Sequence, residues 1–195
     1  MRKAAIIAFL AVLTMGCSAS ADEKAPDNFK VNFDTSRGMV VVEVNRADAP
    51  IGADRLYTLV KAKYFDGARF FRVVPGFVVQ FGLAADPAVI KKWDIPIKDE
   101  TPKTTNARGT LTFAASSMPN SRTTQMFINL ADNGRLDGIG FAPFGKVISG
   151  MEFVDQLYSG DGERPDQGEI QAQGNAYLQK AFPNLDYIKT ASIAP

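Results

Sequence analysis

Apolar and polar residues alternate at the start of the predicted folded region. Every second residue over 29–33 is apolar, which is the period of a strand with one buried face. Residues 36–38, Ser-Arg-Gly, are typical of a turn, and the β-branched run 39–44 reads as a second strand. The pattern therefore predicts an antiparallel hairpin over 29–44.

After the hairpin, the period changes to that of a helix. Pro50 suits the first turn of a helix, and the apolar residues over 51–60 recur at three- and four-residue intervals. A second, short helix is predicted after Gly150, where three apolar residues fall on one face. A third helix is predicted over 173–181, because Phe182-Pro183 would end it.

Short apolar runs rich in β-branched and aromatic residues predict six more strands, at 69–74, 77–81, 110–115, 125–130, 144–148 and 187–193. Many short strands with few helices indicate a closed antiparallel barrel or a sandwich. The large side chains of Phe33, Phe113 and Phe127 favour a filled interior over a roomy one such as that of a lipocalin.

Two polar residues interrupt the apolar strand pair over 70–80. Arg72 and Gln80 flank the turn-forming Pro75-Gly76. Because successive strand residues point to opposite faces, these two side chains can share one face of a sheet. Polar groups at such positions need a partner or a function.

Length and composition limit the number of domains and the kinds of catalytic chemistry that this chain can carry out. A chain of 195 residues that is 46% hydrophobic fits one globular domain with a sizeable core. The sequence has no histidine, so imidazole general bases, Ser/His or Cys/His nucleophile pairs and histidine metal ligands are excluded. We expect no cofactor and no metal site. The acidic segment 161–166 lacks the spacing of an EF-hand loop and predicts a solvated turn.

The N-terminus has the form of a secretory signal. Arg2-Lys3 precedes an apolar run that is too short to span a membrane comfortably. Cleavage after Ala21 would make 1–21 the signal peptide. Alternatively, Cys17 would become the lipidated terminus after removal of 1–16, although Thr14 and Met15 match a lipobox poorly. As the sole cysteine, at the end of the apolar run, Cys17 slightly favours the lipoprotein.

Either form predicts an exported, periplasmic protein whose folded domain contains no disulfide. Residues 22–27 are a short polar leader, and a single domain covers 28–195. Of the 22 basic and 21 acidic residues, removal of Arg2 and Lys3 leaves 20 and 21, a net charge of −1. This balance argues against nucleic acid or an anionic membrane surface as the main partner. A lipid on Cys17 would be the only membrane attachment.

Four motifs in order give the chain a resemblance to a known family. Residues 70–82 resemble the cyclophilin signature F-H-R-x-x-P-G-F-x-x-Q-x-G, and 109–115 resemble its G-x-L-x-M-A segment. Residues 124–129 are similar to S-Q-F-F-I-x, and 136–147 to the block L-D-G followed by F-G-x-V. The resemblance implies a mainly β fold, a closed eight-stranded antiparallel barrel capped by two helices, here with a short extra helix near the C-terminus. It also implies peptidyl-prolyl cis-trans isomerase activity and a monomer.

The resemblance also implies the roles of individual residues. Arg72 matches the catalytic arginine of cyclophilins, Gln80 the side chain that binds a substrate carbonyl, and Phe77 a wall of the proline pocket. The remaining substrate-binding residues implied by the motifs are Val78, Ala114, Ala115, Gln125, Phe127, Arg135, Leu136 and Phe141. The implied partners are proline-containing peptides and unfolded exported proteins.

Some positions depart from the family pattern. Phe71 replaces the signature histidine, which carries no proton in this chemistry, so activity should survive. Arg135 stands where cyclosporin-sensitive members have tryptophan, and the loop over 138–143 differs in length, so Phe141 is only loosely assigned. The resemblance therefore implies turnover with weak binding of cyclosporin.

Two classes of function fit these residues. One is an isomerase that accelerates the folding of exported proteins. The other is a cyclophilin-shaped binding module or chaperone for proline segments, with little turnover. Retention of Arg72 together with Phe77, Gln80 and Phe127 favours the isomerase, because a module that only binds has little need of the arginine.

Overall fold

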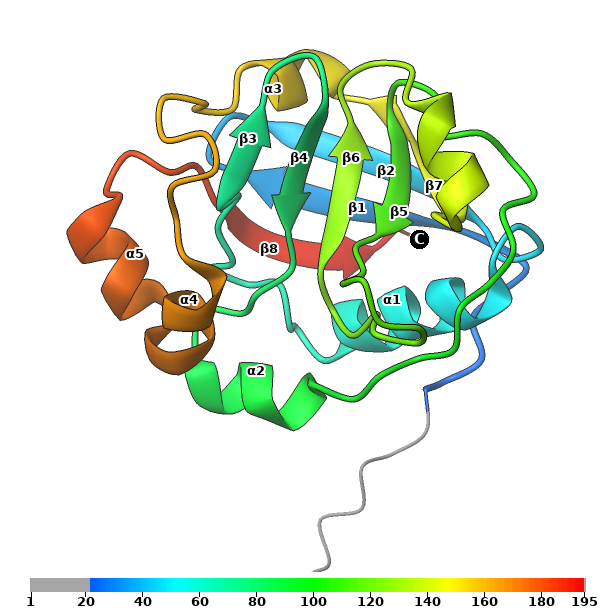
Figure 1. Ribbon diagram of the computed structural model, residues 1–195, viewed down its shortest axis with the longest axis horizontal. Coiled ribbons are helices and arrows are strands. Elements are labelled where there is room, and N and C mark those ends of the chain that lie inside the picture. The colour runs from blue at the N-terminus through cyan, green and yellow to red at the C-terminus, as the bar shows by residue number, and fades with distance from the viewer. Residues whose placement is uncertain (1–21, 195) are drawn as a thin grey trace, which may run out of the picture.

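The computed structural model describes residues 22–194. The predicted signal peptide and Cys17 lie outside these residues. Within them, no helix is both long and apolar enough to cross a membrane. The described chain forms one curled β-sheet with helices at its ends and along one side (Figure 1).

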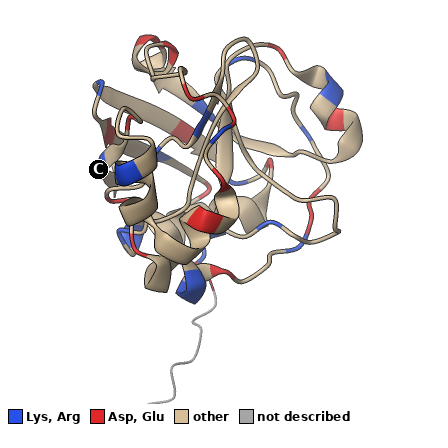
Figure 2. Ribbon diagram, turned by 60° about the vertical axis from the view of Figure 1, so that its left-hand side comes forward, with Lys and Arg blue, Asp and Glu red and all other residues tan. Residues whose placement is uncertain are grey.

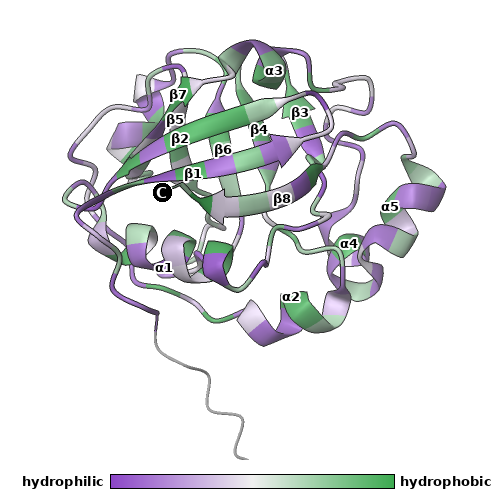
Figure 3. Cartoon of the chain, turned by 180° about the vertical axis from the view of Figure 1, so that it is seen from behind, coloured by the Kyte–Doolittle hydropathy of each residue, from purple (hydrophilic) through white to green (hydrophobic). Residues whose placement is uncertain are grey.

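All eight predicted strands form, and every pairing between them is antiparallel. Their order in the sheet is β3-β4-β6-β5-β7-β2-β1-β8. Figure 3, which views the chain from behind, shows β2, β1 and β8 side by side at the front. The bounds are β1 (Asn28–Thr35), β2 (Met39–Asn45), β3 (Arg72–Val74), β4 (Val78–Phe81), β5 (Thr110–Phe113), β6 (Met126–Asn129), β7 (Pro143–Ser149) and β8 (Ile188–Ile193).

The predicted closed barrel is not confirmed, because the sheet is open between its edge strands β3 and β8. The predicted strand 69–74 is divided: only Arg72–Val74 pairs as a strand, and the residues before it turn toward the C-terminal segment. There, Phe70 N–H donates to the Asp186 carbonyl at 3.0 Å, and an isolated bridge joins Arg69 to Tyr187. The start of β8 is therefore bonded by residues 67–70 and not by β3 itself.

The period of two in the strands divides core from surface. Large side chains fill the concave face of the sheet, as the predicted filled interior requires. Phe33 lies edge-on to Phe65 and Phe81, with ring centroids 5.9 and 5.8 Å away. Phe113 belongs to the same core. The assignment of Phe127 to the interior was wrong, because its ring packs in a separate cluster on the opposite face of the sheet.

The helices are more numerous than the sequence pattern predicts. α1 (Pro50–Lys61) and α3 (Met151–Asp155) were predicted, whereas α2 (Pro87–Trp93) and the 3-10 helix η1 (Gly134–Ile139) were not. The helix predicted over 173–181 corresponds to α5 (Asn175–Ala181), and α4 (Gln167–Gln173) before it was not predicted. Gly174 separates them, because its φ of +59° is not helical and a Cβ there would lie 2.3 Å from the Ala85 carbonyl oxygen.

The polar leader packs against α1. Asp22 accepts a hydrogen bond from Nε of the buried Arg55 at 2.8 Å, and Glu23 accepts one from Lys61 at 2.7 Å. Ala25 is buried, and its N–H donates to Asp54 at 2.8 Å. Residues 22–25 are thus part of the folded body although they contain no helix or strand.

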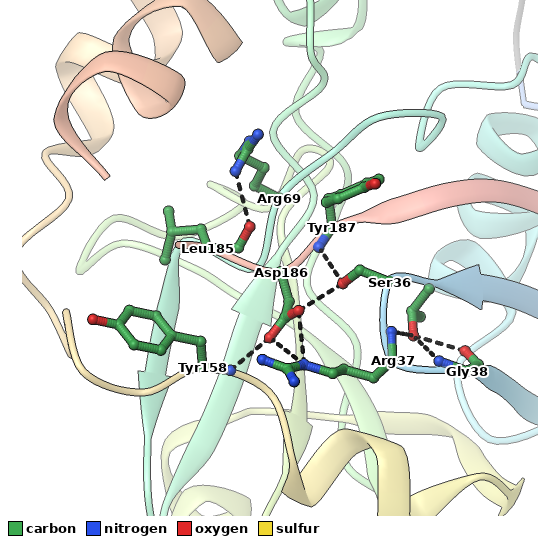
Figure 4. Close-up of polar contacts among 9 residues, drawn as sticks. Ser36, Arg37, Gly38, Arg69, Tyr158, Leu185, Asp186 and Tyr187 are labelled. Atoms are coloured by element: carbon green, nitrogen blue, oxygen red, sulfur yellow. Dashed lines mark hydrogen bonds and ion pairs between the residues drawn. The ribbon is translucent and has the colours of Figure 1, made fainter. Parts of the chain in front are cut away.

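A buried carboxylate joins three distant segments next to the open seam (Figure 4). Asp186 is 7% exposed and precedes β8. It accepts hydrogen bonds from the hydroxyl of Ser36 at 2.7 Å, from Nε of Arg37 at 2.8 Å and from the backbone N–H of Tyr158 at 2.7 Å. The turn after β1, the loop after α3 and the start of β8 are therefore held by one side chain.

We expect Asp186→Ala to lower the free energy of unfolding by about 2–3 kcal/mol, because it removes three hydrogen bonds that one buried, charged acceptor receives. Asp34→Ala is the matched control. Its carboxylate is 39% exposed and pairs with Lys189 across 3.2 Å, so its loss should cost less than about 1 kcal/mol. Denaturant unfolding of both variants measures the difference, and equal costs would show that the Asp186 contacts do not hold the seam.

Candidate functional site

Strand pairing places the predicted site residues in one row. Arg72 on β3 faces Gln80 on β4, and Gln80 faces Phe127 on β6. Directly paired residues of antiparallel strands point to the same side of the sheet. The expectation that Arg72 and Gln80 share a face is confirmed, and the residues between them in sequence, Val73 and Val79, point to the core.

A tight turn sets this register. Phe77 N–H donates to the Val74 carbonyl at 3.0 Å, which closes the turn between β3 and β4. Gly76 has a φ of +73°, a conformation that residues with a side chain disfavour. The ring of Pro75 fixes φ at the turn position before it. The predicted Pro75-Gly76 turn is confirmed.

A groove with a cavity volume of about 690 Å³ lies over this face of the sheet. Ten of the eleven predicted site residues line it: Arg72, Phe77, Val78, Gln80, Ala114, Ala115, Gln125, Phe127, Leu136 and Phe141. Arg135 does not line the cavity. Its guanidinium lies 4.8 Å from the centroid of the Phe77 ring, at the margin of the site.

One end of the groove is polar. Nη1 of Arg72 donates to Oε1 of Gln80 at 3.2 Å, and Nε2 of Gln80 donates to Oε1 of Gln125 at 2.9 Å. Nε of Arg72 donates to Oε1 of Glu163 at 2.6 Å. The same guanidinium lies 5.5 Å from the centroid of the Phe77 ring. Arg72 is therefore held from three sides and remains 24% exposed.

The other end of the groove is apolar. Val78, Phe127 and Leu136 form a buried cluster, and Phe77, Ala114 and Phe141 pack around it. The rings of Phe127 and Phe141 meet edge to face with centroids 5.6 Å apart. A compact apolar hollow of this kind suits a small saturated ring.

Buried asparagines fix the walls of the apolar end. The Nδ2 group of Asn133 donates to the Phe77 carbonyl at 2.9 Å and to Oδ1 of Asn129 at 2.8 Å. Nδ2 of Asn129 donates in turn to Oδ1 of Asn106 at 3.2 Å. Nδ2 of Asn106 donates to the Phe141 carbonyl at 2.8 Å. The backbones of two groove-lining phenylalanines are thus joined through one buried network.

The same network anchors η1 through Asp137, the residue after Leu136. Asp137 accepts hydrogen bonds from the Thr105 hydroxyl at 2.6 Å and from the side chain of Asn106 at 2.7 Å. Burial raises the pKa of the Asp137 carboxyl, but these bonds and one from the Asn106 backbone outweigh burial and hold the pKa below its usual value. Asp137 therefore stays ionised at neutral pH, and it fixes the position of Leu136.

Several groove residues were missed by sequence reasoning. They come from α2 and its end, from the loops around β5 and β6, and from α4: Asp94, Ser116, Ser121, Thr123, Gln167 and Gln171. Glu163 was also missed, because 161–166 was interpreted as a solvated turn. That interpretation was wrong for Asp161, which is 8% exposed and pairs with Arg164. The only local signal near Glu163 is a run of acidic residues, and nothing in that run indicates a contact with Arg72.

The arrangement is suited to binding and orienting a substrate. It joins a permanent cation and two amides to an apolar hollow, and no proton-transfer pair is needed for such a task. Among residues 22–194, no cluster of three or more Cys, Asp or Glu side chains could hold a metal ion.

Comparisons with known proteins agree with this geometry. The sequence matches the family model "Cyclophilin type peptidyl-prolyl cis-trans isomerase/CLD" over residues 30–174. It is 38% identical over 153 residues to a peptidyl-prolyl cis-trans isomerase of Acinetobacter baylyi, covering 76% of this chain and 80% of that protein. It is 34% identical over 162 residues to peptidyl-prolyl cis-trans isomerase A of Dickeya dadantii, covering 80% and 85%.

Solved structures show the same fold. A cyclophilin-type isomerase of Cryptosporidium parvum, crystallised in the presence of the dipeptide Ala-Pro, superposes with a TM-score of 0.65 at 23% identity and covers 85% of this chain and 99% of its own. The cyclophilin AquaCyp293 of Hirschia baltica gives a TM-score of 0.64 at 17% identity, covering 87% and 75%.

The chain belongs to the family of cyclophilin-type isomerases, because the family model covers most of its length and its curated relatives match over most of theirs. It is accordingly a peptidyl-prolyl cis-trans isomerase, as the motifs implied.

Proposed function

We propose that this isomerase rotates X-Pro bonds in exported proteins, with Arg72 stabilising the twisted amide. The proline ring would occupy the apolar hollow of Val78, Phe127 and Leu136. The observation that carries the proposal is that this hollow and the guanidinium of Arg72 line one groove on the same face of the sheet. A ring bound there lies beside a permanent hydrogen-bond donor.

The chemistry requires no covalent step. Rotation of an amide meets a barrier of about 18–20 kcal/mol, because the bond has partial double character. In the twisted state this character is lost, and the proline nitrogen gains a lone pair that can accept a hydrogen bond. A donor that fits the twisted state better than either planar state lowers the barrier.

Arg72 is suited to this role, because its guanidinium is always charged and carries five N–H groups. Glu163 contacts the Nε and Nη2 edge and Gln80 accepts one bond from Nη1, which leaves other N–H groups for a substrate. Gln80 and Gln125 would bind substrate carbonyls beside the ring. A preorganised cation costs little reorganisation at the moment of rotation.

The mixed distribution of acidic and basic residues is compatible with peptide substrates of either charge. In Figure 2 acidic and basic residues are interspersed over the visible face. A balanced surface does not steer partners of one sign, so recognition would depend on the groove itself. We therefore propose proline-containing segments of unfolded proteins as substrates.

Export is part of the proposal. Asp22 binds Arg55, and either processing route, after Ala21 or before Cys17, keeps Asp22 in the mature chain. We expect cell fractionation to find the protein in the periplasm or on its membrane. Mass determination of the mature N-terminus should give Asp22 or a lipidated Cys17. An unprocessed Met1 on the cellular protein would refute export.

For the catalytic role, we expect Arg72→Ala to lower kcat/KM for a proline peptide by at least tenfold, because a hydrogen bond made in the transition state is lost. The free energy of unfolding should change little, since the partner of this partly exposed side chain, Glu163, is 63% exposed. A coupled peptide isomerisation assay measures turnover. Arg108→Ala, an exposed arginine outside the groove, is the control and should keep full activity.

Normal turnover of Arg72→Ala would remove the arginine from the mechanism. Peptide binding without turnover in the unmodified protein would instead favour the binding module.

We also propose weak inhibition by cyclosporin, because Arg135 replaces the tryptophan of sensitive relatives with a mobile charged group. An indole supplies a flat apolar wall and one donor, whereas a guanidinium must be desolvated. We expect Arg135→Trp to tighten inhibition at least fivefold and to change peptide turnover much less. Drug titration of both proteins in the same assay tests this. Tight inhibition of the unmodified protein, or no gain in the variant, would show that another residue forms the wall.

A further inference from the structure

We propose that Glu163 is a positioning residue that orients Arg72 for turnover. The inference rests on the proposed role of Arg72 in the reaction. Glu163 lies outside every motif that implied a function, on the loop between α3 and α4, 91 residues from Arg72 in sequence. Its carboxylate nevertheless makes the shortest contact of the Arg72 guanidinium, 2.6 Å from Nε and 2.5 Å from Nη2.

The contact uses one edge of the guanidinium. Oε1 of Glu163 lies against the Nε and Nη2 edge, while Gln80 accepts a single bond from Nη1. A guanidinium is a rigid plane, so restraint of one edge fixes the direction of the donors that remain. Gln80 alone, bound at 3.2 Å through one atom, leaves the plane free to rotate about that contact. Glu163 is the second hydrogen-bonding restraint, in addition to the Phe77 ring 5.5 Å from the guanidinium.

The loop that carries Glu163 is itself held in place. The N–H of Val73, the residue after Arg72, donates to the Gly162 carbonyl at 3.3 Å, so the loop is bonded to β3 beside the arginine. The buried carboxylate of Asp161 pairs with Arg164, whose guanidinium lies 5.8 Å from the Phe182 ring. A side chain on a loop braced from both neighbours can hold a partner in a fixed position.

The restraint is of moderate strength and is sensitive to salt. The side chain of Glu163 is 63% exposed, and exposed ion pairs contribute little to stability. Loss of the carboxylate should therefore leave folding nearly intact and change the orientation of Arg72. Raising the ionic strength from about 0.01 M to about 1 M shortens the screening length from about 30 Å to about 3 Å and should weaken the pair.

The test compares Glu163→Ala and Glu163→Gln with the unmodified protein on an uncharged proline peptide. We expect Glu163→Ala to lower kcat about fivefold with KM unchanged, and Glu163→Gln, which keeps an acceptor oxygen, to lower kcat about twofold. Glu169→Ala on α4 is the matched control, because it removes the same charge six residues away and outside the groove. It should keep full turnover.

A double-mutant cycle shows whether Glu163 acts through Arg72. In the Arg72→Ala background, Glu163→Ala should cause no further loss of the residual turnover. High salt should lower kcat of the unmodified protein about twofold to threefold and leave kcat of Glu163→Ala unchanged. A merely structural role would lower turnover in both backgrounds and shift the unfolding midpoint.

The outcomes separate this inference from the proposed function. If Arg72→Ala keeps full turnover, the proposed function fails. If Arg72→Ala loses turnover while Glu163→Ala turns over normally, or faster because the carboxylate competes with substrate, only the positioning role of Glu163 is overturned. A loss from Glu163→Ala that is equal in the two backgrounds would overturn it as well.

Discussion

The pairing of β3, β4 and β6 is the constraint on which the site depends. A strand has two faces, and a shift of one residue would exchange them. The observed register puts Val73, Val79 and Ile128 in the core, so their neighbours Arg72, Gln80 and Phe127 must point away from it. The register that buries the apolar residues of these strands in the core therefore also aligns the site residues on the other face of the sheet.

A second layer of structure keeps the groove in shape. Carbonyls of Phe77 and Phe141 are bonded to Asn133 and Asn106, whose side chains are almost fully buried. A buried amide that lost its partners would pay a large desolvation cost, so the network resists rearrangement. A pocket with rigid walls binds a rigid ring without having to order itself first, which favours preorganisation over induced fit.

Local patterns were sufficient for much of the structure and for most of the site. Alternation and short runs of β-branched and aromatic residues predicted all eight strands, and ten of the eleven site residues that the motifs implied line the groove. What they missed depends on contacts between distant segments. Glu163 meets Arg72 across 91 residues, and residues before β3, rather than β3 itself, bond to the C-terminal segment. The break between α4 and α5 at Gly174 follows from the close approach of the Ala85 carbonyl. This contact joins segments distant in sequence, so the spacing of apolar residues in a helix does not reveal it.

The position of β8 has a consequence for when the domain can fold. β1 lies between β2 and the edge strand β8, so one side of β1 is paired only by the last residues of the chain, with Val31 opposite Ile193. The Asp186 contacts to Ser36 span 150 residues. Such contacts form late, and an unpaired edge invites association with other chains until they do. A chain made or threaded from its N-terminus therefore remains an incomplete sheet until its final strand emerges. Under the export proposed above, that delay would keep the precursor threadable, and it would make this isomerase a chain that itself needs protection until its last strand emerges.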